Sequence, residues 1–165
     1  MAQPTIRYWS WAHVVPQLLS LALLILLFWI FLPAQDVGEA FLFGAAIFVT
    51  YSFGSRYLIP TAHRRGMKAM SLKDYDTAID QFQRSYEFFS KHYWLDKYRG
   101  VTMMSPSIWS YREMALMNVA SAHVARKDFE AAQAACLRVL DESPQNEIAS
   151  STIEMIQATS GVSET

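Results

Sequence analysis

The sequence holds one cysteine, Cys136, and only 6 glycines among its 165 residues. A single cysteine excludes an intrachain disulfide and every CxxC metal or redox motif, so we expect Cys136 to be a small core residue. No P-loop, GxGxxG or GxSxG motif is present to hold a phosphate or a nucleophile. Because the 4 histidines also lack HExxH spacing, we expect no enzyme, no metal site and no cofactor.

Charge is nearly missing from the first part of the chain. Residues 1–60 carry only Arg7, Asp36, Glu39 and Arg56, so 12 of the 14 Lys and Arg residues and 13 of the 15 acidic residues come later. This division indicates a membrane part followed by an aqueous domain. The net charge of -1 leaves no basic excess to neutralise a phosphate backbone, which argues against general nucleic-acid binding.

Two apolar runs predict transmembrane helices over residues 14–32 and 40–59. The first is free of charge and close to the ~20 residues that a helix needs to cross ~30 Å of hydrocarbon. A cleaved signal peptide is the alternative for this run, but its apolar region is usually only about 7–15 residues long. The second run ends near Arg56, which can reach the headgroups, and Pro60 stops the helix. Residues 1–60 should therefore form a tight membrane hairpin.

The distribution of basic residues predicts an orientation. Arg56, Arg64, Arg65 and Lys68 lie at or just beyond the end of the second run, whereas the linker between the runs carries only acidic charge. Because Lys and Arg favour the cytoplasmic side, both termini and the following domain should be cytoplasmic, with these four residues at the membrane surface. The bacterial inner membrane is the expected location, and the lipid bilayer an expected partner.

After residue 60 the hydrophobic period becomes that of amphipathic helices. Ala78, Phe82 and Tyr86 recur at helical spacing, with acidic and basic residues on the other faces. A second helical pair should begin at Ser105 and Pro106, because serine caps first-turn amides and proline suits the first turn.

Two segments, KDYDTAIDQFQRSY (73–86) and KDFEAAQAACLRVL (127–140), resemble the second half of a tetratricopeptide repeat, with Lys73 and Lys127 where that family has a turn glycine. The resemblance implies an all-α fold over residues 61–158, with about two repeats and a capping helix, followed by a flexible tail at 159–165. Ala78 and Ala132 are 54 residues apart, where adjacent repeats are ~34 apart, so an insertion should occupy about 91–110. Further matching positions are Gly66, Ala69, Tyr75, Phe82, Leu116, Val119, Ala120, His123, Phe129 and Pro144.

The resemblance also implies a ligand groove. The positions that line it in the family correspond here to Met67, Met70, Met114, Met117, Ser121 and Val124. A flexible, methionine-rich groove can re-pack around a partner helix or peptide. The alternative is that these methionines only fill gaps between helices.

The insertion supplies a second candidate surface, rich in aromatic residues and methionine. Such residues anchor contacts with another subunit, although they could equally pack on the chain's own repeats or on nearby headgroups. The candidate residues are Tyr93, Trp94, Tyr98, Met103, Met104 and Trp109.

These features predict a membrane-anchored adaptor that recruits or assembles a protein partner through its groove. The alternative is a constitutive accessory subunit of a larger membrane complex, held mainly by its transmembrane helices.

Overall fold

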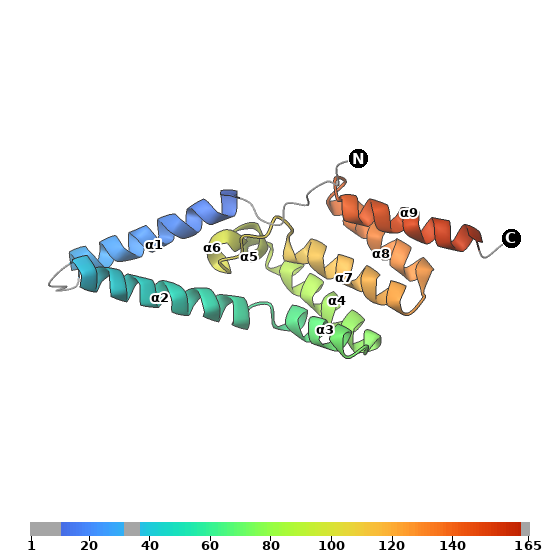
Figure 1. Ribbon diagram of the computed structural model, residues 1–165, viewed down its shortest axis with the longest axis horizontal. Coiled ribbons are helices and arrows are strands. Elements are labelled where there is room, and N and C mark those ends of the chain that lie inside the picture. Colours follow the sequence, from blue (N-terminus) through green and yellow to red (C-terminus); the bar gives the residue numbers. More distant parts are fainter. Residues whose placement is uncertain (1–10, 32–36, 163–165) are drawn as a thin grey trace. The chain divides into compact units, whose positions relative to one another are not determined.

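The computed structural model describes residues 11–31 and 37–162, and within these ranges the chain is all α-helical, as the sequence predicts, with no strand (Figure 1). The linker at residues 32–36 and the residues before Trp11, including Arg7, lie outside the described part. The helices are α1 (Trp11–Phe31), α2 (Val37–Leu58), α3 (Thr61–Ser71), α4 (Tyr75–Lys91), α5 (Tyr93–Lys97), α6 (Arg99–Thr102), α7 (Tyr111–Ala125), α8 (Phe129–Glu142) and α9 (Glu147–Val162).

The described chain divides into two compact units. We call the first, residues 11–31, 37–59 and 94–110, the hairpin unit. The second, residues 60–93 and 111–162, is the repeat unit.

In the hairpin unit, α1 and α2 lie side by side (Figure 1). Gly44 makes their closest approach possible, because a Cβ atom there would lie 2.9 Å from Cγ1 of Ile25. Phe28 and Phe43 stack beside this contact, with ring centroids 6.0 Å apart. Both helices are long and apolar enough to cross a membrane, over Val14–Phe31 and Val37–Leu58. α2 ends two residues before Pro60, where the sequence places the end of the second run.

The repeat unit consists of two helical hairpins and a final helix. α3 packs on α4, α7 packs on α8, the two hairpins join through α4 and α7, and α9 covers α8 (Figure 1). Phe82, Leu116 and Val139 fill the core, and Cys136 is buried among them as expected. Gly66 lets α3 approach α4, since a Cβ atom there would lie 2.7 Å from the Phe82 ring.

The turns inside the two hairpins share one geometry. Lys73 and Lys127 adopt left-handed backbone conformations, with φ of 59° and 62°. The next residue then caps the following helix: Asp74 accepts a hydrogen bond from the backbone N–H of Thr77 at 3.2 Å, and Asp128 accepts one from Ala131 at 3.2 Å. Hydrogen bonding to the side chain of Thr77, and secondly to its backbone N–H, lowers the pKa of Asp74. Equivalent lysines and aspartates therefore build equivalent turns 54 residues apart.

Residues 94–110, which we call the return segment, differ from the expectation. They group with the hairpin unit, whereas the sequence suggested an insertion within the soluble domain. The helix expected to begin at Ser105 starts only at Tyr111. The reason is that Arg99 binds the carbonyl oxygens of Ser107 and Ile108, which holds that stretch in an irregular conformation.

The C-terminal helix is longer than expected. Asn146 caps α9 by accepting a hydrogen bond from the backbone N–H of Ala149 at 3.0 Å. The helix then continues through Val162, four residues into the stretch expected to be a flexible tail. Residues 163–165 lie outside the described part.

Candidate functional site

The predicted groove residues lie on α3 and α7 of the repeat unit. Met114, Met117, Ser121 and Val124 are spaced so that they share one face of α7, as Met67 and Met70 do on α3. Met67 is half exposed and Ser121 is exposed, whereas Met70 and Met117 pack against the core. Met114 and Val124 are partly buried. We call these six residues the methionine face. Most of them fill space between the helices, and Met67 is its one exposed apolar side chain.

His63 joins α3 to α7. Its ring stands edge-on to Tyr111 of α7, with centroids 5.5 Å apart, and edge-on to Phe82 of α4 at 5.4 Å. Its Nε2 lies 3.5 Å from the side-chain nitrogen of Asn118. This contact aligns the two helices that carry the methionine face.

Burial lowers the pKa of His63 from 6.5 to about 4. Desolvation disfavours the charged imidazolium, and the ring's neighbours Phe82, Tyr111 and Asn118 bring no carboxylate to offset it. His63 is therefore neutral at physiological pH and acts as an aromatic core residue.

Other titratable groups in the repeat unit have structural partners. Nδ1 of His123 lies 3.1 Å from the carboxylate of Asp128, which ties the end of α7 to the turn before α8. Burial raises the pKa of the Cys136 thiol, which makes it less nucleophilic. Among the described residues, no group of three or more His, Cys, Asp or Glu side chains is placed to hold a metal ion.

A polar network that the sequence did not suggest links α4, α7 and α8. The carboxylate of Glu142 accepts hydrogen bonds from the Tyr86 hydroxyl at 2.5 Å and from Arg112 at 2.7 Å. Arg138 and Arg112 also lie over the Tyr86 ring, 5.0 and 5.5 Å from its centroid. Its members are far apart in sequence and follow no motif. The arrangement is that of a structural brace between the hairpins.

The candidate residues of the insertion separate into two groups. Tyr93, Trp94 and Tyr98 are exposed, with exposed fractions of 54 to 59%. Met103 and Met104 are buried, at 0 and 3%, so their assignment to an exposed contact surface is wrong. They follow α6 and turn inward where the chain becomes irregular, and Trp109 is partly buried.

Arg99 organises the return segment and was not singled out by its sequence context. Its guanidinium group is almost fully buried and donates to the carbonyl oxygens of Asp96 at 3.1 Å, Ser107 at 3.1 Å and Ile108 at 2.5 Å. The feature of the sequence that could have pointed to this role is a single arginine within a stretch rich in aromatic residues. Its side chain replaces the backbone hydrogen bonds that a regular helix would supply.

Two side chains of α2 bind the return segment to the hairpin. The Tyr51 hydroxyl donates to the carbonyl oxygen of Thr102 at 3.1 Å, and the Arg56 guanidinium donates to that of Met104. Met104 has a φ of 49°, a left-handed conformation that a methionine adopts only when its surroundings impose it. α6 also packs against α1.

The predicted membrane-surface cations are mostly accessible. Arg56 is exposed in the last turn of α2, and Arg65 and Lys68 are exposed on α3. Arg64 is partly buried. Three of the four are therefore exposed, and of these Arg56 also binds the carbonyl oxygen of Met104.

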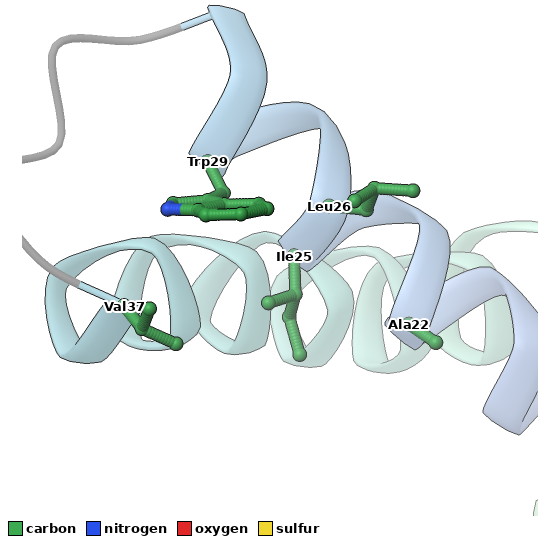
Figure 2. Close-up of a pocket in the computed structure, with 5 residues that line it drawn as sticks. All are labelled: Ala22, Ile25, Leu26, Trp29 and Val37. Carbon is green, nitrogen blue, oxygen red and sulfur yellow. The ribbon is translucent and has the colours of Figure 1, made fainter.

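The hairpin unit also has an apolar hollow of about 370 Å³ beside the start of α2. Figure 2 shows that Trp29 and Ile25 of α1 face it together with Val37 of α2; Ala22 and Leu26 complete the lining. The lining carries no charged group, and the Trp29 indole N–H is its only polar side-chain group, so the hollow suits an apolar chain or side chain.

Comparisons with protein-family profiles, with curated proteins and with solved structures find no match to this chain. The functional argument therefore depends on the chain's own residues.

Proposed function

We propose that this protein is a membrane-anchored adaptor, in which α1 and α2 cross the bilayer and the methionine face of a tetratricopeptide-like repeat unit binds a segment of a partner protein. One observation carries the proposal: the same chain combines two exposed apolar helices with a separately packed repeat unit whose methionine face leaves Met67 half exposed.

Exposure of the hairpin side chains supports the membrane anchor. No residue in the window Val14–Phe31 is buried by the rest of the described chain, and Leu19 and Leu23 are more than half exposed. In water, each Å² of such surface costs about 25 cal/mol relative to burial. A bilayer removes this cost, and the exposed cations Arg65 and Lys68 after α2 favour a cytoplasmic repeat unit in a bacterial inner membrane.

The proposed ligand is an amphipathic or extended segment with apolar anchor residues. Met67 offers it an accessible, unbranched side chain that can adapt to different shapes. Arg65 and Lys68, exposed on the same helix, favour acidic residues beside those anchors. Such a partner would be recruited to the membrane without any catalytic step by this chain.

The test is crosslinking and gentle detergent co-purification from native membranes, comparing wild type with Met67→Glu. Met155→Glu is the matched control, because Met155 lies on α9 and is 53% exposed against 50% for Met67. We expect Met67→Glu to remove one co-purifying protein selectively and Met155→Glu to retain it. Equal retention by both variants would contradict binding at the methionine face.

The apolar hollow favours a second candidate function, a constitutive subunit of a membrane complex held through α1 and α2. Ala22→Phe fills that hollow without adding charge. A stoichiometric partner lost from Ala22→Phe but retained by Met67→Glu would favour the subunit over the adaptor.

A further inference from the structure

The return segment lies against the last two turns of α2. Tyr51 is bound to Thr102 and lies seven residues before Leu58, the end of the apolar helix. At about 1.5 Å of rise per residue, that places Tyr51 ~10 Å inside the helix end. If α2 crosses a bilayer, the return segment reaches the depth of the headgroups and the outer acyl chains.

The backbone of this segment is unusually well satisfied by side chains. Five of them, from Tyr51, Arg56, Arg99, Thr102 and Ser107, donate to its carbonyl groups. In water, exposed carbonyls bind solvent, but irregular backbone at membrane depth is tolerated only when the protein supplies the partners. The acceptors are the carbonyl oxygens of Leu95, Asp96, Tyr98, Thr102, Met104, Ser107, Ile108 and Trp109.

Its outward side chains match an interface. Trp94 and Tyr98 are 58 and 59% exposed, and Val101 is 41% exposed. Tyr and Trp concentrate where acyl chains meet headgroups, because their rings are apolar and their tips are polar. Lys97 lies with its ammonium 5.7 Å from the Tyr98 ring centroid, and a lysine there can extend to phosphate. Arg99, by contrast, is turned inward, and each of its three guanidinium nitrogens donates a hydrogen bond to a backbone carbonyl oxygen.

We propose that residues 94–108 form an interfacial re-entrant segment, which inserts into one leaflet of the bilayer beside α2 with Trp94 and Tyr98 as its anchors. The proposal rests on membrane insertion of α1 and α2. It assigns the exposed aromatic residues of the insertion to lipid, and a protein partner on the same residues becomes an outcome that the test can detect.

The first test measures the depth of single tryptophans by fluorescence quenching. The chain has 5 tryptophans, so variants retain only Trp94 or only Trp29, with the others changed to Phe. A third variant lacks all five and carries Met155→Trp in the repeat unit. Each is reconstituted in phosphatidylcholine vesicles whose acyl chains carry bromine near the headgroup or near the chain end.

We expect the fluorescence of Trp94 to be quenched more strongly by bromine near the headgroup than by bromine near the chain end. The fluorescence of Trp29 should be quenched in the same vesicles. The tryptophan of the Met155→Trp variant should be quenched by neither lipid. Quenching of Trp29 without quenching of Trp94 would overturn the re-entrant segment and leave the membrane anchor intact. Absence of quenching at both positions would overturn the anchor as well, so the two failures are distinguishable.

A second measurement retains all tryptophans. A nitroxide is attached at Tyr98→Cys in a Cys136→Ala background, with Glu87→Cys on α4 as the control. We expect the label at position 98 to collide more often with oxygen than with a water-soluble nickel complex in vesicles, and the label at 87 to show the reverse. Equal nickel access at both positions would contradict the proposal, and protection at 98 that appears only when a protein partner is added would assign these aromatics to that partner.

Discussion

The hairpin unit and the repeat unit use apolar side chains in opposite ways. The repeat unit buries a core of large apolar side chains, with Phe82 at 0% exposure, whereas α1 and α2 of the hairpin unit turn most of theirs outward, with Phe53 at 73%. Removal of apolar surface from water therefore accounts for the packing of the repeat-unit core. Between the hairpin helices the contact includes a close approach at Gly44, and small residues at such contacts are typical of helices that associate in lipid.

The largest expected difference is between two variants that each lose a phenylalanine side chain, one in the repeat unit and one in the hairpin unit. Phe82→Ala should lower the free energy of unfolding of the repeat unit by about 3–5 kcal/mol, because it leaves a cavity in the core. Phe53→Ala in α2 should change it little. Urea unfolding of the full chain in mild detergent, followed by circular dichroism, measures both. A similar loss in the two variants would break the distinction between the units.

A pH dependence should also belong to the repeat unit. The folded pKa of His63 is about 4 and the unfolded value is 6.5, so between these values the unfolded chain binds a proton that the folded chain does not. The stabilisation is fully present above the unfolded pKa and is lost as the pH falls through this window, by about 3 kcal/mol in total.

Urea midpoints at neutral and mildly acidic pH measure this slope, and His63→Phe serves as the control because it retains a ring but cannot titrate. The wild type should lose more stability than His63→Phe on acidification. Parallel losses would show that other groups cause the pH dependence.

In the hairpin unit, close packing of the helices is tested by changing two glycines of α2, one at the helix contact and one away from it. Gly44→Ala would place its Cβ 3.1 Å from the backbone of Ile25, so the helices must separate, and we expect a loss of about 1–3 kcal/mol. Gly54→Ala meets nothing within 4 Å and should be tolerated. Unfolding of the full chain by sodium dodecyl sulfate in mixed micelles compares them, and equal behaviour would argue against close packing at Gly44.

The smallest expected effect is a stabilisation. Lys127 adopts a φ of 62°, which glycine occupies without steric cost, so Lys127→Gly should stabilise the repeat unit by about 0.5–1 kcal/mol. Lys127→Ala keeps the Cβ atom and should not. Thermal midpoints of the two variants give the comparison, and an equal shift in both would show that backbone strain is not the cause.

The sequence predicts local features well where periodicity and turn chemistry act over a few residues. The helical character of both parts and the turns at Lys73–Asp74 and Lys127–Asp128 are in the structure as expected. The membership of a tetratricopeptide family, the groove and the adaptor role stay predictions. The methionine face also shows the limit of a pattern, since spacing does not tell that Met67 is exposed while Met117 packs on the core.

The position of the return segment could not be predicted from the sequence, and the reason here is a different one. Its position depends on the contact of Tyr51 with Thr102, which joins residues 51 positions apart, and on three hydrogen bonds from one arginine. Neither leaves a repeating signal in the sequence. The Ser105–Pro106 pair has the composition of a helix start, but Arg99 binds the carbonyl groups that follow it, so tertiary contacts override local preference.

The single buried thiol gives the protein a reporter of its own motion. Cys136 is fully shielded within α8 and its raised pKa keeps it protonated, so an alkylating reagent reaches it only when the repeat unit opens. The rate of its alkylation therefore reports how readily the repeat unit opens, without an added label. A ligand that binds the closed repeat unit should lower the alkylation rate of Cys136 in proportion to the fraction of protein that has ligand bound.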